Sequence, residues 1–273
     1  MVSGILLPSI GNIISHLILL SKIKKFEDIP DRVECLKDYY DTEDCFILAA
    51  GPSLNNYDAN YVKEKLKDKL IISLKQSIKN FMDVTDFHVL NFANYEPYEK
   101  YSSNTIVVWE VYEHFHPKMI LDNNIRCDIM LPIDGNRIPD TIEKNLKSQC
   151  GENSWDEYTL DKTLSRWYGP GIMFQTAIHL AEHLGVKSIT TLGWDIADMN
   201  SFKDDPYDDS FQKHSYEGKS NIVYAPTPTN KHEAETVIKS TKFLNEWLMS
   251  KNIDFKIISE TNPAHESIER VTL

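Results

Sequence analysis

The sequence predicts an α/β fold of the Rossmann-like type, in which a mostly parallel sheet is covered by helices on both faces. Short, continuous apolar runs of strand length recur along the chain, and helical patterns lie between several of them. The first clear run ends directly in Gly51-Pro52, as a buried parallel strand does before a turn. In such sheets ligands bind at the carboxyl ends of the strands, so we expect the functional site there.

The apolar runs give the expected strands, and the clearest of them covers residues 45–50. The later runs share its length and its β-branched or aromatic content. We expect helices at residues 58–66, 171–184 and 232–249, where helical spacing or end signals occur. The remaining expected strands cover residues 70–74, 87–92, 105–109, 129–131, 188–192 and 255–258.

Composition is typical of a globular protein. The 273 residues are 41% hydrophobic and 26% charged, which fits a main domain at residues 41–273 preceded by an apolar helical segment at residues 1–40. The formal net charge of -12 repels polyanions, so we expect no nucleic acid partner. The four cysteines form no CxxC pair, which indicates a reducing, cytoplasmic compartment and no zinc site.

The N-terminal segment is strongly apolar from residue 5 to residue 20 and is followed by Lys22, Lys24 and Lys25. It is shorter than the ~20 apolar residues of a spanning helix, and it lacks the features of a secretory signal. Its apolar side chains follow helical spacing. Two interpretations stay open: the helix docks on the protein's own core or on a second copy, or residues 5–25 lie on the inner face of a membrane.

A long polar stretch, residues 198–230, is rich in Asp, Tyr and Pro and shows little periodicity. Loops of this length in compact domains are functional lids or disordered segments, and we expect a lid that closes over the site. The acidic cluster at residues 204–209 could bind a divalent cation, although such runs more often form a solvated loop.

Gly51-Pro52-Ser53 is the first candidate binding feature, because it follows a strand and precedes the expected helix at residues 58–66. Glycine lets the backbone approach a ligand, and proline fixes the turn. The serine hydroxyl and the neighbouring N–H groups can bind an anion at a helix start. An ordinary strand-to-helix turn has the same residue types, so the turn needs support from elsewhere in the chain.

That support comes from a resemblance. Ile47-Leu48-Ala49-Ala50-Gly51-Pro52-Ser53-Leu54 resembles the nucleotide-binding signature of the bacterial CMP-sialic-acid-dependent sialyltransferases of glycosyltransferase family 42. It is equally similar to motility accessory factors and archaeal hydroxymethylpterin pyrophosphokinase-like proteins. Trp167-Tyr168-Gly169-Pro170-Gly171 and the later Leu192-Gly193-Trp194-Asp195 resemble the second signature of the sialyltransferases. Asn91 ends a strand as a nucleotide-contacting Asn does in that family, and His232 has the spacing of its catalytic histidine.

The resemblance implies a variant GT-A-like fold and a metal-independent, inverting transferase without a cofactor beyond its CMP-linked donor. His232 is implied as the general base, since an imidazole accepts a proton near neutral pH. Tyrosines of the lid are candidates to meet the charge of the leaving phosphate. The donor-binding residues implied are Gly51, Pro52, Ser53, Asn91, Gly169, Gly171 and Asp195, with Tyr207, Tyr216 and Tyr224 from the lid.

The chain departs from the family at informative positions. Ala50 stands where the sialyltransferases have Asn, and Gly169-Pro170 replaces their Thr-Ser. Lys75 or Gln76 occupies the region of another nucleotide-contacting Asn. A lysine at position 75 can meet phosphate charge directly, which fits CMP and also a diphosphate.

Three functions therefore stay open. The first is transfer of sialic acid or a related ulosonic acid from CMP to a glycan hydroxyl. The second is pyrophosphoryl transfer to a pterin, which requires ATP and Mg²⁺. The third is a non-catalytic nucleotide-binding accessory protein that docks through its apolar N-terminal segment.

His179-Leu180-Ala181-Glu182-His183 has the spacing of a zinc-binding H-x-x-E-H helix. We instead predict that these histidines lie on the solvated face of the helix. In that interpretation Ile172, Thr176, Leu180 and Leu184 form its buried stripe.

Overall fold

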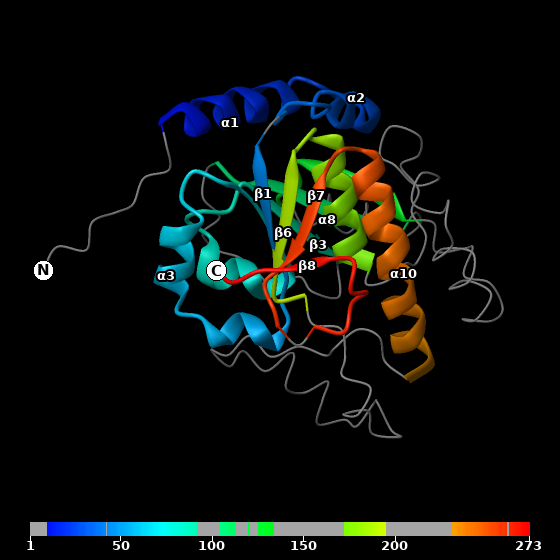
Figure 1. Ribbon diagram of the computed structural model, residues 1–273. Coiled ribbons are helices and arrows are strands. Elements are labelled where there is room, and N and C mark those ends of the chain that lie inside the picture. The colour runs from blue at the N-terminus through cyan, green and yellow to red at the C-terminus, as the bar shows by residue number, and fades with distance from the viewer. Residues whose placement is uncertain are drawn as a thin grey trace, which may run out of the picture.

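The computed structural model describes residues 10–41, 43–91, 104–112, 120, 125–133, 172–194, 231–260 and 262–273. The described residues contain one eight-stranded sheet in which every pairing is parallel, in the order β5-β4-β3-β2-β1-β6-β7-β8 (Figure 1). The predicted α/β fold is confirmed. The strands are β1 (Asp44–Leu48), β2 (Leu70–Leu74), β3 (Phe87–Asn91), β4 (Ile106–Tyr112), β5 (Ile129–Ile133), β6 (Ser188–Leu192), β7 (Asp254–Ile257) and β8 (Glu269–Arg270).

Seven of these strands match the predicted runs, and two of them, β2 and β6, have the predicted bounds. The eighth strand, β8, was not predicted, because two charged residues at the edge of a sheet carry no apolar signal. The strand predicted at residues 105–109 continues to Tyr112, so its apolar run includes one acidic residue, Glu110. That residue belongs to the candidate site.

The strand order reverses direction between β1 and β6. From β1 the chain adds β2, β3, β4 and β5 on one side, and it then returns to place β6, β7 and β8 on the other side. Such a reversal leaves a crevice at the carboxyl ends of the two strands where it occurs, and open α/β sheets bind ligands there. The topology therefore predicts a ligand site at the carboxyl ends of β1 and β6.

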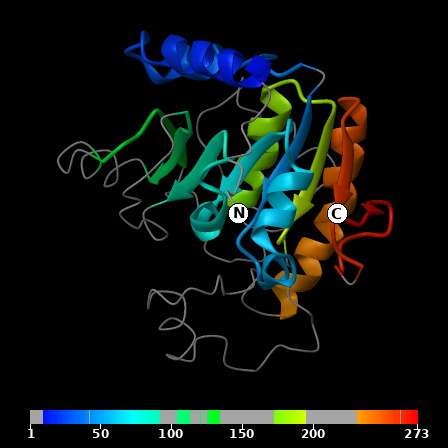
Figure 2. The ribbon, with the colours of Figure 1, turned by 90° about the vertical axis from the view of Figure 1, so that its left-hand side faces the viewer.

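Helices cover both faces of the sheet (Figures 1 and 2). Along β1, Cys45 and Ile47 pack into the same core cluster as side chains of α8 (Ile172–His183) and α10 (Lys231–Ser250). The alternate residues, Phe46 and Leu48, pack with α3 (Ala59–Lys65) and α4 (Ile78–Phe81) on the opposite face. This period of two is what a strand buried on both faces requires, and it explains the continuous apolar runs.

Two further helices, α1 (Ile10–Ile23) and α2 (Ile29–Glu34), lie across the amino-terminal edge of the sheet (Figure 1). Leu19, Leu20 and Ile23 of α1 are buried in the same cluster as the α8 side of the sheet, so one side of this helix docks on the protein's own core. Among the described residues, no helix combines the length and the apolar character needed to cross a bilayer.

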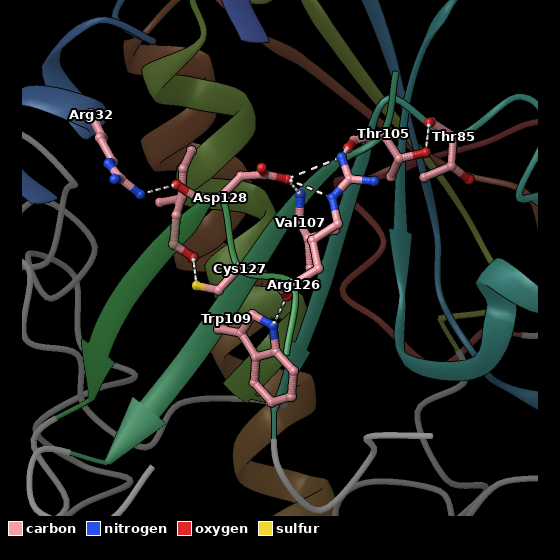
Figure 3. Close-up of polar contacts among 9 residues, drawn as sticks. Arg32, Thr85, Thr105, Val107, Trp109, Arg126, Cys127 and Asp128 are labelled. Atoms are coloured by element: carbon pink, nitrogen blue, oxygen red, sulfur yellow. Dashed lines mark hydrogen bonds and ion pairs between the residues drawn. The ribbon is translucent and has the colours of Figure 1, made fainter. Parts of the chain in front are cut away.

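Polar groups at the amino-terminal edge near β4 and β5 are engaged in a hydrogen-bond network (Figure 3). The Asp128 carboxylate accepts from the Val107 amide at 2.8 Å and from Arg126 Nε at 3.3 Å. Arg32 of α2 donates to the Asp128 carbonyl at 2.9 Å, and Trp109 Nε1 donates to the Arg126 carbonyl at 2.9 Å. These bonds satisfy the buried starts of the strands, so this network serves the fold.

Candidate functional site

Two turns from distant parts of the sequence meet at the carboxyl ends of β1 and β6. The hydrogen-bond ladder continues past the strand ends, since the Ala49 amide donates to the Leu192 carbonyl at 2.8 Å and the Gly51 amide to the Gly193 carbonyl at 2.8 Å. Gly193 has φ of +78°, and a Cβ at that position would lie 2.5 Å from the Ala49 carbonyl oxygen. Only glycine allows this approach, so the two turns are held together as one corner.

The C-terminal segment fixes this corner from the other side. Asn262 Nδ2 donates to the Trp194 carbonyl at 2.6 Å, and its Oδ1 accepts from the Ala264 amide at 2.9 Å. The Arg270 guanidinium donates to four backbone carbonyls of this segment, including that of Asn262. The turn after β6 is therefore set in place by residues about seventy positions later in the chain.

The Gly51-Pro52-Ser53 turn leads into a different element from the predicted one. It opens a 3-10 helix, η1 (Pro52–Asn56), and the predicted helix at residues 58–66 begins separately as α3, where the Asp58 carboxylate accepts the Tyr61 amide at 3.0 Å. Gly51 is extended, with φ of -75°, so its left-handed freedom is not used. A 3-10 helix of five residues has a smaller dipole than an α-helix, so the predicted anion site depends on local N–H groups and the Ser53 hydroxyl.

A second corner lies at the carboxyl end of β2, the strand beside β1. Lys75 adopts the left-handed conformation, with φ of +53°, which is uncommon for a residue with a side chain. His88 Nε2 donates to the Lys75 carbonyl at 2.7 Å. Ser77 Oγ accepts from the Leu74 amide at 3.0 Å and lies 2.7 Å from the Leu48 carbonyl of β1. The bonds to His88 and Ser77 compensate for the backbone strain and fix the direction in which Lys75 leaves the sheet.

Burial lowers the pKa of His88 to about 4, because the protein interior disfavours the charged imidazole. The neutral ring carries its proton on Nε2, since a carbonyl oxygen can only accept. His88 is fully buried and acts as a structural support for the backbone at Lys75.

The Lys75 ammonium interacts electrostatically with the buried carboxylate of Glu110. Burial lowers the pKa of Lys75, and the Glu110 carboxylate acts in the opposite direction. Glu110 is fully buried on β4, where it stands in register with Asn91 at the end of β3. The Thr176 hydroxyl of α8 donates to the Glu110 carboxylate. Lys75, Asn91, Glu110 and Thr176 thus collect at the carboxyl side of three adjacent strands and the start of a helix.

Lys75 and Asn91 were predicted as site residues from the sequence, but Glu110, Thr176 and His88 were not. The sequence does contain a signal for Glu110. An acidic side chain inside a run of valines and aromatics loses its hydration when it is buried, so it indicates polar partners nearby. The predicted strand stopped one residue short of it. Thr176 was expected only as part of the buried stripe of its helix, and burial of that residue is confirmed.

The proposed base, His232, lies in the first turn of α10. Helices that connect parallel strands run antiparallel to them, so α8 and α10 both begin at the carboxyl edge of the sheet (Figures 1 and 2). Ser240, eight residues further along α10, is already buried, which places the backbone of His232 about 12 Å beyond it along the helix axis. The backbone of His232 therefore starts at the same edge as the two corners.

Several predicted site residues lie outside the described residues. They adjoin elements that end or begin at this edge, since α8 starts one residue after Gly171 and the described turn after β6 stops at Trp194, one residue before Asp195. The others are Gly169, Tyr207, Tyr216 and Tyr224, together with the lid at residues 198–230 and its acidic cluster at residues 204–209.

The prediction that His179 and His183 lie on a solvated face was wrong. The His179 ring is fully buried with its centroid 4.9 Å from that of Trp247 on α10, and His183 Nε2 donates to the Val33 carbonyl of α2 at 2.8 Å. Helix α8 is covered by the sheet on one side and by α10 and α2 on others, so polar residues off the apolar stripe are also buried. Within the described ranges, no three metal-binding side chains gather in one place.

A shallow hollow of about 460 Å³ lies beside β8 and is lined by Glu260, Arg270, Val271 and Thr272. The guanidinium of Arg270 already donates to backbone carbonyls of its own segment, and burial lowers its pKa. This arginine serves the C-terminal segment rather than an anion. The chemistry of the site is concentrated at the two corners.

Comparison of the sequence with protein-family models and with curated proteins gives no match.

Proposed function

We propose that the chain is a metal-independent, inverting glycosyltransferase that moves sialic acid or a related ulosonic acid from CMP to a glycan hydroxyl. The observation that carries the proposal is the grouping at one edge of the sheet. The Gly51 and Gly193 turns meet where the strand order reverses, and a constrained lysine ends the next strand. Helix α10 carries a histidine in its first turn at the same edge. Crevices of this kind bind nucleotides in open α/β sheets.

In this proposal the CMP phosphate sits against the backbone of Gly51 and the hydroxyl of Ser53. The Lys75 ammonium neutralises the phosphate charge, and Asn91 supplies hydrogen bonds to the nucleotide. Glu110 has a supporting role, because its carboxylate opposes the lowering of the Lys75 pKa by burial. The left-handed backbone at Lys75 is set before the ligand binds, so little reorganisation accompanies the reaction.

The reaction joins the acceptor oxygen to the anomeric carbon of the donor and breaks the bond from that carbon to the CMP phosphate oxygen. CMP leaves with the electron pair, and the proton of the acceptor hydroxyl passes to His232. Gly169, Gly171 and Asp195 complete the donor site, with Tyr207, Tyr216 and Tyr224 as the lid's candidates for the leaving phosphate. Closure of residues 198–230 excludes water and limits hydrolysis of the donor.

Lys75 also supports a second candidate, pyrophosphoryl transfer from ATP with Mg²⁺ to a pterin. A lysine in place of an amide suits a diphosphate, whose charge is larger than that of CMP. The two candidates differ in their need for a divalent cation.

Calorimetric titration with CMP, CDP, UDP, GDP and ATP, each with and without Mg²⁺, separates them. We expect CMP to bind in EDTA with an affinity that Mg²⁺ does not change. Binding of ATP alone, and only with Mg²⁺, would contradict the glycosyltransferase proposal.

A transfer assay with a CMP-linked ulosonic acid tests the base. His232→Ala should lower the transfer rate by about 10²–10⁴ while CMP binding is retained. The matched control is His265→Ala, since this histidine packs near the middle of α10, where its amide bonds the Thr241 hydroxyl at 2.7 Å. Equal rates in the two variants would exclude His232 as the base and favour the accessory role.

A further inference from the structure

Helix α1 has two different faces. His16, Leu19, Leu20 and Ile23 are buried against the body of the protein. On the opposite side Ile14 is 52% exposed, Leu17 44% and Ile18 49%, which is unusual for three large aliphatic side chains on one helical face. Residues 14, 17 and 18 are neighbours at i, i+3 and i+4, so they form one continuous apolar surface, called here the outer face of α1.

The outer face is held in a fixed direction by polar contacts on the inner side. His16 Nδ1 lies 2.5 Å from the Tyr40 hydroxyl, and the Tyr39 hydroxyl donates to the Ser15 carbonyl at 2.8 Å. At the border between the inner and outer sides, Lys22 Nζ lies 5.0 Å from the centroid of the Tyr39 ring. The helix is thus attached through one side and presents its other side outward.

Basic side chains border this surface. Lys22, Lys24 and Lys25 are exposed, and residues 10–25 contain no acidic side chain. The turn continues past the helix end, because the Lys24 amide donates to the Leu20 carbonyl and the Lys25 amide to the Lys22 carbonyl. At 100° per residue, position 25 falls in line with positions 14 and 18, while positions 22 and 24 flank that line. In a chain of net charge -12, this is a local cluster of positive charge.

We propose that the outer face of α1, with Lys22, Lys24 and Lys25, docks on an anionic bilayer surface. An apolar face bordered by lysines matches the interfacial region of a bilayer, where the aliphatic side chains enter the acyl boundary and the ammonium groups meet anionic headgroups. The acidic side chains begin only at Glu27, beyond the turn that carries the lysines.

The size of the surface favours a bilayer over a second copy of the chain. Among the described side chains of this surface, the three aliphatic ones, each about half exposed, together with Phe26 at 36%, present a few hundred Å². A stable protein interface buries about 800 Å² on each partner. A bilayer requires no matching protein surface and adds attraction for each lysine.

Docking through α1 determines which edge of the sheet faces away from the bilayer. Helix α1 lies at the amino edge of the sheet, and the two corners lie at the carboxyl edge (Figure 1). A five-residue strand such as β1 spans about 16 Å, so the corners lie about that far from α1, on the side of the sheet away from the bilayer. The docking itself does not depend on the function proposed above.

Co-sedimentation of the full chain with vesicles tests the proposal. We expect binding to phosphatidylcholine vesicles that contain phosphatidylglycerol, little binding to phosphatidylcholine alone, and release by added salt. The double variant Leu17→Glu and Ile18→Glu should reduce the bound fraction at least about tenfold. Met249→Glu is the matched control, because Met249 is 64% exposed on α10, and this variant should bind like the unchanged chain.

A second double variant, Lys24→Glu and Lys25→Glu, alters only exposed charges and should lose binding to the anionic vesicles while its melting temperature is kept. Three outcomes would overturn the proposal. The first is that both double variants bind vesicles as well as the unchanged chain, and the second is that the unchanged chain binds neutral vesicles equally well. The third is that the unchanged chain does not bind vesicles but forms a dimer, and that the Leu17→Glu and Ile18→Glu variant is monomeric. The last result would assign the face to a second copy.

Discussion

Substitution of Gly193 by alanine tests whether the contact between the two turns creates the nucleotide site. A side chain at φ of +78° costs about 1–2 kcal/mol from local sterics alone. The added Cβ would also lie 2.5 Å from the Ala49 carbonyl oxygen and 3.2 Å from Leu54 Cβ. Because one of these atoms is backbone, the turn after β1 must move away, and the Gly51 amide must give up part of its bond to the Gly193 carbonyl.

The two costs together give an expected loss of about 2–4 kcal/mol in the free energy of unfolding, or roughly 5–15 °C in melting temperature for a chain of this size. The displacement opens the corner that is proposed to bind the CMP phosphate. We therefore expect CMP affinity to fall at least about tenfold, measured by calorimetric titration at a temperature where the variant is folded.

Gly185 provides the control. It also has a positive φ, +79°, and a Cβ there would lie 2.9 Å from Asp38 Cα, but it follows α8 at the amino edge of the sheet. Gly185→Ala should lower the melting temperature by a similar amount and leave CMP affinity unchanged. If Gly193→Ala binds CMP as tightly as the unchanged chain, or if both variants lose affinity equally, the corner is not the nucleotide site.

Other substitutions test the second corner and the docking of α1. Glu110→Gln removes the carboxylate that favours the charged form of Lys75, so the pKa of Lys75 should fall further. Titrations across pH should then show CMP binding lost at a lower pH than in the unchanged chain. His88 has a pKa of about 4 in the fold and 6.5 as its ordinary value, so the unfolded chain binds the extra proton between these values. The free energy of unfolding therefore falls by up to about 3 kcal/mol as the pH is lowered from 6.5 toward 4. His88→Gln should remove this dependence, so its melting temperature should change less between pH 6.5 and pH 4. Leu19→Ala should cost about 2–5 kcal/mol in denaturant unfolding, whereas Leu17→Ala on the exposed side should stay within about 0.5 kcal/mol.

The fold class was predictable because its signals are local. A strand buried on both faces needs a continuous apolar run wherever it occurs, so residues 70–74 and 188–192 could be assigned with correct bounds. The same reasoning found the helices α8 and α10 and the helical spacing of residues 10–23. Part of the site was local as well, since a polar or glycine residue directly after a buried strand marks the carboxyl edge of a parallel sheet. Gly51 was identified in this way, whereas Lys75 and Asn91 were identified from the resemblance to the sialyltransferases.

The remaining features of the site depend on contacts between segments that are distant in the sequence. The sequence could not tell that Gly193 packs on Ala49, or that the carbonyl of Lys75 is held by a histidine thirteen positions later. It also placed His179 and His183 in solvent, because a helical stripe shows which side is apolar but not how many neighbours cover the helix. The sequence by itself determined where the buried strands and the longer helices form, since their apolar patterns lie within each element, whereas the charged edge strand β8 was not predicted. Only the tertiary structure decided which polar groups are buried and what they bond, because burial and hydrogen bonding depend on partners that the chain brings in from elsewhere.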